Sequence, residues 1–270
     1  MIVLIRGGGD LASGVAYRLM RAGLKVVITE LAQPLAVRRH AAFAQAVFAG
    51  ETTVEGITAR RVSDPEDTLR VLQILAKGQV PVLIDPSAEA ALALHPSVIV
   101  DARLIKHPPE PLKHQAQLYI GLGPGFTAGK DCHVVIETNR GHRMGRVIWQ
   151  GSAQDDTGVP EQVQGRHGER VLRAPAAGVL ETQVEIGAVV VEGQPLASVA
   201  GQVLAAPFDG VLRGLLYPGL KVEVGQKIGD LDPRSDPLLC TQISDKSLAV
   251  GGGVLEAILS RPEIRPNLWK

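Results

Sequence analysis

The first third of the chain alternates between apolar runs and amphipathic stretches. Ile2–Ile5 and Lys25–Thr29 are apolar enough for buried strands. Between them Leu11, Val15 and Leu19 recur at helical spacing, which predicts a helix over 11–21. Further helices are expected over 64–77 and 87–94, and further strands over 80–84 and 98–101. This alternation predicts a Rossmann-like α/β domain over residues 1–105.

The pattern changes after residue 105. Short apolar runs between glycine-rich turns predict a β-rich segment over 106–170, which contains a glycine loop and ends in a linker. An internal repeat follows, in which residues 174–199 and 206–231 align at an offset of 32 with nine of 26 positions identical. Two units too small to bury their own apolar faces are expected to pack together as a pseudo-twofold sandwich over 171–233. Residues 234–270 are expected to form a C-terminal segment whose helix packs back on the rest.

The repeat resembles the lipoyl/biotinyl-type barrel-sandwich fold in its A-P-x-x-G-V and V-x-x-G-Q patterns. The fold class expected is therefore α/β, with a Rossmann-like N-terminal domain followed by a lipoyl/biotinyl-like barrel-sandwich module. The turn between the two halves, Ala200–Gln202, has no lysine that could carry a prosthetic group. A structural or partner-binding module is expected instead of a carrier.

The N-terminal glycine turn has the context of a dinucleotide fingerprint. Gly7, Gly8 and Gly9 separate a strand from a helix, and Glu30 closes the next strand about twenty residues later. Asp10 departs from the pattern, because a carboxylate at a helix N-terminus opposes a bound pyrophosphate. A nucleotide or pterin phosphate site and a purely structural turn remain equal alternatives. Arg38 and Arg39 are candidates to hold a phosphate or carboxylate, against the alternative of a solvated helix start.

A second candidate site combines a glycine loop with the strand that follows it. Gly121, Gly123 and Gly125 precede a strand on which alternation puts Asp131, His133 and Glu137 on one face. A histidine with two carboxylates can serve acid–base chemistry or hold a metal ion, so these three are the candidate catalytic residues. The alternative is an antiparallel strand with a polar outer face. The metal, if any, is left unassigned.

Four segments together resemble one family: Gly7–Gly14 (GGGDLASG), Glu30–Arg39 (ELAQPLAVRR), Gly121–His142 (GLGPGFTAGKDCHVVIETNRGH) and Ile243–Leu259 (ISDKSLAVGGGVLEAIL). The resemblance is to the YqeB family, accessory proteins of selenium-dependent molybdenum hydroxylases. It implies a role in maturing or inserting the molybdenum cofactor, with the hydroxylase as client protein. The ligand could then be the pterin cofactor or a phosphate-bearing precursor. An NAD(P)-dependent oxidoreductase and a non-catalytic scaffold for the hydroxylase remain alternatives.

Composition narrows the class of partner. The chain has 28 basic and 28 acidic residues, and only 3% of its residues are aromatic, which argues against nucleic-acid binding. Two cysteines make no disulfide framework. No apolar stretch approaches the length of a membrane span and no signal peptide is evident, so a cytoplasmic location is expected. Whether the chain forms a homo-oligomer is left open.

Overall fold

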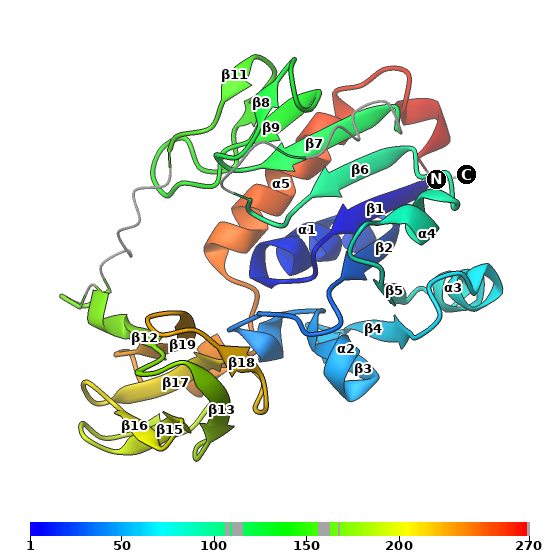
Figure 1. The fold of residues 1–270 in the computed structure, drawn as a ribbon. Coiled ribbons are helices and arrows are strands. Elements are labelled where there is room, and N and C mark those ends of the chain that lie inside the picture. The colour runs from blue at the N-terminus through cyan, green and yellow to red at the C-terminus, as the bar shows by residue number, and fades with distance from the viewer. Residues whose placement is uncertain (106–108, 110–115, 156–162, 167, 269–270) are drawn as a thin grey trace. The chain divides into compact units, whose positions relative to one another are not determined.

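A computed structural model describes residues 1–105, 109, 116–155, 163–166 and 168–268. The chain forms two compact units (Figure 1). Unit 1 comprises Met1–Pro34, Phe43–Asp156 and Ile243–Lys270, and unit 2 comprises Leu35–Ala42 and Thr157–Gln242. No helix in the described ranges is long and apolar enough to cross a membrane.

Unit 1 is built on a nine-stranded mixed sheet with the order β10-β9-β7-β6-β1-β2-β5-β4-β3. Its strands are β1 (Ile2–Arg6), β2 (Lys25–Glu30), β3 (Glu51–Val54), β4 (Ile57–Val62), β5 (Val80–Ile84), β6 (Val98–Asp101), β7 (Leu118–Leu122), β9 (Val134–Ile136) and β10 (Val147–Ile148). The seven central strands are parallel, and β3 and β10 pair antiparallel at the two edges. A separate antiparallel pair is formed by β8 (Thr127–Ala128) and β11 (Gly151–Ser152).

Helices cover both faces of this sheet. The helices of unit 1 are α1 (Asp10–Arg21), α2 (Gln45–Ala49), α3 (Thr68–Ala76), α4 (Glu89–Leu92), α5 (Asp245–Leu259) and the 3-10 turn η5 (Arg265–Asn267). One core packs α1 and α5 against side chains such as Val3, Ile5 and Ile136. The other core packs α3 and α4 against side chains such as Leu4 and Tyr119. Because both faces are covered, the central strands are nearly continuous apolar runs.

Helices α1 and α5 lie side by side on one face of the sheet (Figure 1). Glycines allow the backbones of the two helices to approach closely. A Cβ at Gly14 would lie 2.4 Å from the carbonyl oxygen of Ser247, and a Cβ at Gly251 would lie 2.6 Å from the carbonyl oxygen of Gly14. A side chain at either position would push the two backbones apart.

Unit 2 contains two four-stranded antiparallel sheets, with orders β12-β19-β17-β14 and β16-β15-β13-β18. The strands are β12 (Val171–Arg173), β13 (Gly178–Thr182), β14 (Val189–Val190), β15 (Pro195–Val199), β16 (Gln202–Ala205), β17 (Gly210–Leu215), β18 (Lys221–Val222) and β19 (Lys227–Asp232). In the described part of unit 2, three 3-10 turns accompany them: η1 (Arg39–Ala41), η3 (Gly168–Arg170) and η4 (Pro237–Cys240).

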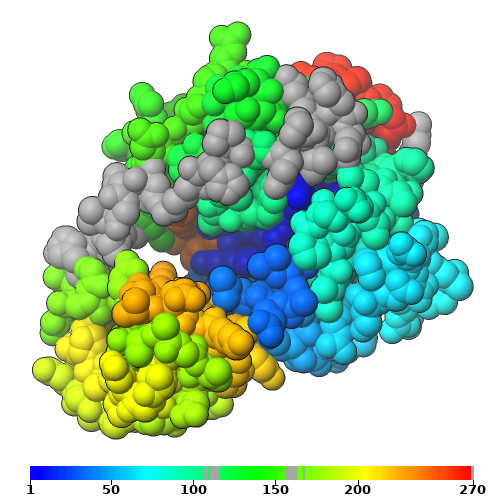
Figure 2. All heavy atoms as spheres, viewed as in Figure 1, coloured from blue at the N-terminus to red at the C-terminus, as the bar shows by residue number. Residues whose placement is uncertain are grey.

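The two halves of the internal repeat exchange strands in unit 2. Strand β14 of the first half pairs with β17 of the second, and β18 of the second half pairs with β13 of the first. Figure 2 shows the yellow-green and yellow-orange halves packed against each other on the face in view. A shared core that includes Leu196, Phe208 and Leu231 lies between them. Neither half could bury these side chains alone.

The structure corrects the predicted fold class. The β-α-β opening is confirmed, and the strands expected over 80–84 and 98–101 are present. However, the molecule has one large mixed sheet and three smaller antiparallel sheets in its described part, not a Rossmann-like domain ending at residue 105 followed by a barrel-sandwich module. Strands β7, β9 and β10, from the segment predicted to be separate, extend the N-terminal sheet because they pair in register with β6 and with one another. Part of the predicted linker, 156–162, lies outside the described residues.

Candidate functional site

The carboxyl ends of β1, β6, β7 and β9 meet at one edge of the unit 1 sheet, since the four strands are parallel neighbours. The segments that leave these strands line a pocket of about 180 Å³, which we call the strand-end pocket. It is lined by Leu11, Leu104, Pro124, Thr138, Asn139, Gln154, Asp155 and Lys246. Open α/β sheets bind ligands outside the carboxyl ends of their strands, which makes this the first candidate site.

The strand-end pocket combines an apolar part with a few polar groups. Leu11, Leu104 and Pro124 supply the apolar part. Lys246, in the first turn of α5, and Asp155 supply opposite charges. The backbone of Leu104 has φ +55°, a left-handed conformation that is uncommon for a residue other than glycine, and its side chain is 41% exposed. Strained backbone that presents an apolar side chain at a pocket is typical of a binding site.

Glu137 holds the polar wall of this pocket in place. Its carboxylate is buried and accepts the backbone N–H of Asn139 and of Gln154, each at 2.8 Å. Both partners line the strand-end pocket. Arg140, which follows Asn139, donates two hydrogen bonds of 2.6 and 2.8 Å to Asp245, which precedes Lys246. This pair joins the loop after β9 to the start of α5, so Asn139 and Lys246 are held near each other.

A buried polar network supports the apolar side of the same pocket. The carboxylate of Asp101, at the end of β6, accepts hydrogen bonds from the Tyr119 hydroxyl at 2.9 Å and from Arg103 at 2.7 to 3.2 Å. Arg6 at the end of β1 adds a third donor at 3.4 Å. Burial, together with the charge of Asp101, raises the pKa of Tyr119, so its hydroxyl stays a donor. The network fixes the start of the segment that leaves β6 and carries Leu104.

A second pocket of about 480 Å³ borders the first, and Gln154 lines both. We call it the arginine pocket. It is lined by Glu137, Arg143, Arg146, Val147, Ile148, Gln150, Ser152, Ala153 and Gln154.

The predicted catalytic residues do not share one site. Asp131 and His133 precede β9 and Glu137 follows it, roughly 13 Å from His133 at the ordinary rise of a strand. Asp131 accepts the N–H of Thr127 and His133 Nδ1 accepts the N–H of Tyr119, both at 2.9 Å. The strand between them is buried on both faces, and β9 is an inner strand of the sheet, between β7 and β10. Of the three, only Glu137 lines a pocket described above.

The predicted phosphate turn is occupied by the protein itself. Gly8 N–H donates to Glu30 at 2.7 Å, and Gly7 N–H donates to the Thr29 carbonyl at 2.8 Å. Burial raises the pKa of Glu30 in spite of its hydrogen bonds from Leu31 and Gly8. Gly9 is the N-cap of α1, and Asp10 accepts a hydrogen bond from the Ser247 hydroxyl at 3.0 Å. The turn thus lies among carboxylates, which does not suit an anion.

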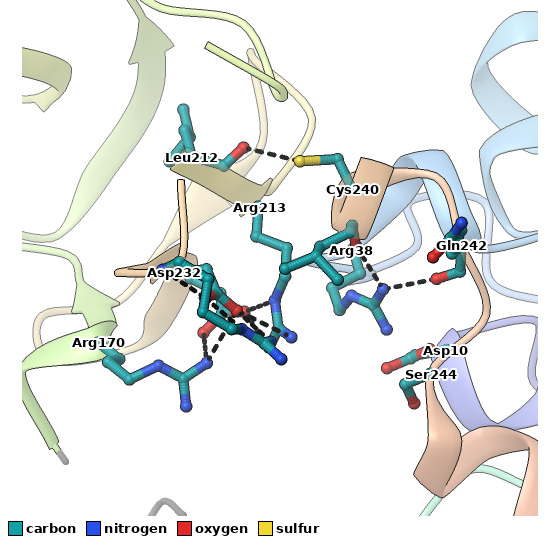
Figure 3. A network of polar contacts seen from close by, with 12 residues as sticks. Asp10, Arg38, Arg170, Leu212, Arg213, Asp232, Cys240, Gln242 and Ser244 are labelled. Carbon is teal, nitrogen blue, oxygen red and sulfur yellow. Dashed lines mark hydrogen bonds and ion pairs between the residues drawn. The ribbon is translucent and has the colours of Figure 1, made fainter. Parts of the chain in front are cut away.

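The predicted arginines belong to the other unit. Arg38 donates to the carbonyls of Leu239 and Gln242 at 3.0 and 2.8 Å (Figure 3), and Arg39 donates to the carbonyl of Leu215 at 2.7 Å. Both side chains are buried within unit 2. Arg39 thus bonds the end of β17, and Arg38 bonds η4 and the residues that follow it.

The glycines of the predicted loop serve packing. A Cβ at Gly121 would lie 2.3 Å from the Phe126 ring, and a Cβ at Gly125 would lie 2.1 Å from the Ile105 carbonyl oxygen. Gly123, at φ +79°, packs on the Thr138 hydroxyl. The loop is compact because these three positions lack side chains, and it contributes Pro124 to the strand-end pocket.

Apart from Glu137, the candidate residues from the sequence do not line the two pockets. Lys246, the pair Gln154–Asp155, and Arg143 with Arg146 come from separate segments, and none of them was a candidate site residue. The available signal was their position just after strands and at the start of the last helix. Within the described part of the chain, no group of three or more histidine, cysteine, aspartate or glutamate side chains could hold a metal ion.

Unit 2 contains a charged cluster of two aspartates and three arginines. Asp230 and Asp232 of β19 form ion pairs with Arg170, Arg213 and Arg234, and Figure 3 shows Asp232 between Arg170 and Arg213. Burial alone would raise the pKa of Asp232, but hydrogen bonds from Arg234 and the charge of Arg213 outweigh it and lower the pKa to about 2. Cys240, whose thiol points at the Leu212 carbonyl, is buried nearby, and burial raises its pKa. A protonated thiol and mutually paired charges indicate a structural cluster.

No family model matches the chain. Among solved structures, it resembles an aspartoacylase family protein from Mesorhizobium loti at 12% identity and a TM-score of 0.27, covering 85% of this chain and 84% of that one. It also resembles a succinylglutamate desuccinylase from a Silicibacter species at 14% identity and a TM-score of 0.25, over 85% and 84% of the two chains. At these TM-scores the likeness assigns no activity to the chain.

These findings correct the predicted function. The solved structures that it resembles are aspartoacylases and desuccinylases, not accessory proteins of molybdenum hydroxylases or lipoyl-type modules. The predicted role in selenium-dependent hydroxylase maturation, with its phosphate-bearing ligand, is corrected on the geometry of unit 1: the glycine turn expected to hold the phosphate is already bonded to Glu30, and Asp10 beside it to Ser247. The same bonded turn argues against the NAD(P)-dependent oxidoreductase, and no comparison supports the hydroxylase scaffold. The occupied glycine turn gives the physical reason for rejecting the nucleotide site.

One curated relative matches most of the chain. It is the uncharacterized protein YqeB of Escherichia coli (strain K12), 48% identical over 258 residues, which are 96% of this chain and 47% of that protein. The chain thus spans about half the length of this relative. The identity over nearly the whole chain supports the YqeB family label that the sequence motifs indicate.

Proposed function

We propose that unit 1 binds a small zwitterionic organic molecule, of the size and charge of an amino acid, in the strand-end pocket. The carboxylate of the ligand would face Lys246 and its ammonium group would face Asp155. The observation that carries this proposal is the presence of opposite charges and three apolar side chains around one small pocket at the carboxyl ends of parallel strands.

The size of the pocket limits the ligand. Its volume of about 180 Å³ is slightly larger than the roughly 150 Å³ of a cavity that holds benzene. A molecule of about six to ten non-hydrogen atoms fits such a volume. Leu11, Leu104 and Pro124 would contact a short apolar side chain, and the amides of Asn139 and Gln154 would add hydrogen bonds.

The polar groups that line the pocket favour binding of both ends of the ligand. A zwitterion leaves neither Lys246 nor Asp155 facing a like charge, whereas a simple anion would face the carboxylate of Asp155. Glu137 and the pair Arg140–Asp245 hold the wall before any ligand arrives. Such preorganisation lowers the entropy cost of binding.

The test is calorimetric titration of the whole protein with each common amino acid. We expect at least one with a small apolar side chain to bind, and its N-acetyl and amide derivatives to bind more weakly because each lacks one charge. Lys246→Met should weaken binding by about 10- to 100-fold, as a charged hydrogen bond contributes about 1.5–3 kcal/mol.

Lys77→Met is the matched control, because Lys77 is an exposed lysine at the end of α3 and lines neither pocket. It should bind like the wild type. Absence of binding by every amino acid, or equal binding by the Lys246→Met variant, would refute the proposal.

A further inference from the structure

The arginine pocket has its own chemistry, distinct from that of the strand-end pocket. Two guanidinium groups, Arg143 and Arg146, line it together with the polar side chains Gln150 and Ser152. Val147 and Ile148 of the edge strand β10 add apolar surface. Its volume of about 480 Å³ lies within the usual range for small-molecule sites.

The charges in this pocket favour an anion. Among the described residues that line it, Glu137 is the one carboxylate, and both of its oxygens accept backbone N–H groups. In the described structure, no salt bridge joins Arg143 or Arg146 to a carboxylate. Arg146 is oriented by a hydrogen bond from its Nε to the His142 carbonyl at 3.2 Å, which leaves its two terminal nitrogens to meet a ligand.

Two guanidinium groups indicate more than one acidic group on the ligand. Each guanidinium is a planar fork that binds one carboxylate through two parallel hydrogen bonds. The apolar surface of Val147 and Ile148 suits a short carbon chain between two such groups. A single carboxylate would use one arginine and leave the other in water.

We infer that the arginine pocket binds a short organic dicarboxylate, with one carboxylate at Arg143 and the other at Arg146. This site is separate from the proposed zwitterion site, although Gln154 lines both pockets. The two arguments rest on different charged side chains, Lys246 and Asp155 in one and Arg143 and Arg146 in the other, so either can fail alone.

Calorimetric titration of the whole protein with glutarate, butyrate and inorganic phosphate tests the inference. Glutarate should bind at least tenfold more tightly than butyrate, which has the same three-carbon chain but only one carboxylate. Arg143→Gln and Arg146→Gln should each weaken glutarate binding by tenfold or more. Arg70→Gln, which removes an exposed arginine on α3, should leave it unchanged.

Two results would overturn the inference. One is phosphate or butyrate binding as tightly as glutarate, because the pocket would then be a general anion site. The other is loss of glutarate binding in Lys246→Met with retention in the Arg143→Gln, Arg146→Gln double variant, because glutarate would then occupy the strand-end pocket. The melting temperatures of all variants, measured alongside, separate loss of binding from loss of fold.

Discussion

The two units place charged side chains to opposite effect. In unit 2, Asp230 and Asp232 pair with three arginines, and all these partners come from the unit itself. In unit 1, Lys246, Asp155, Arg143 and Arg146 line pockets at the ends of strands. The paired charges of unit 2 are therefore structural, and the candidate sites of unit 1 are made of residues from several separate segments.

The same difference appears in how backbone groups are used. In unit 1, the Glu137 carboxylate accepts hydrogen bonds from two backbone N–H groups and so shapes the wall that two pockets share. In unit 2, the guanidinium groups of Arg38 and Arg39 donate hydrogen bonds to backbone carbonyls of β17, of η4 and of Gln242. Buried polar groups that bond the backbone stabilise the fold, whereas a ligand requires polar groups that line a cavity.

The largest expected effect is that of Asp232→Asn. The change removes a buried negative charge that pairs with Arg170, Arg213 and Arg234, and breaking a buried pair costs about 3–5 kcal/mol. Hydrogen exchange of the β17 and β19 amides should show a loss of this size. Asp209→Asn, at an exposed carboxylate that accepts one backbone N–H, should cost less than about 1 kcal/mol. Equal losses in both variants would show that the cluster is not structural.

Acid should destabilise unit 2 for the same reason. The pKa of Asp232 is about 2 in the folded chain against 3.8 for an ordinary aspartate. A lowered pKa stabilises the fold above pH 3.8, and this stability, roughly 2 kcal/mol, is lost as the pH falls toward 2. Exchange rates of β19 amides, corrected for intrinsic pH dependence, measure it. Asp232→Asn should abolish this pH dependence, and its persistence in that variant would assign it to another group.

A matched pair of glycines tests the packing of unit 1. Gly251→Ala should lower its stability by about 1–3 kcal/mol, because the new Cβ meets the Gly14 carbonyl at 2.6 Å. Gly252→Ala, next to it on α5 with open space around the Cβ position, should instead raise stability by up to about 1 kcal/mol. Intrinsic tryptophan fluorescence during urea unfolding reports both; the chain has two tryptophans, Trp149 and Trp269. If both variants lose stability, α1 and α5 do not pack as described.

The smallest expected effect is that of Lys246→Met on stability. A lysine that lines a pocket and is partly exposed should change the free energy of unfolding by less than about 0.5 kcal/mol without ligand. Urea unfolding followed by intrinsic tryptophan fluorescence measures it. A loss comparable to that of Asp232→Asn would remove the contrast between the two units.

The sequence by itself determined the local elements. The apolar runs Ile2–Ile5 and 25–29 form β1 and β2, and the spacing of Leu11, Val15 and Leu19 forms the buried face of α1. The internal repeat likewise shows as matching strand pairs in unit 2. These features depend on the period of each element and on glycine turns, which neighbouring residues specify.

Only the tertiary structure decided which segments meet. The pairing of β7 with β6 and of β9 with β7 extends the sheet beyond the N-terminal third, and no local pattern specifies a strand's neighbour. That pairing separates His133 from Glu137 at opposite ends of β9 and brings Leu104, Asn139 and Lys246 to one pocket. A site at strand ends is assembled from residues far apart in sequence, because long-range pairing and the helix packing at Gly14 and Gly251 bring them together.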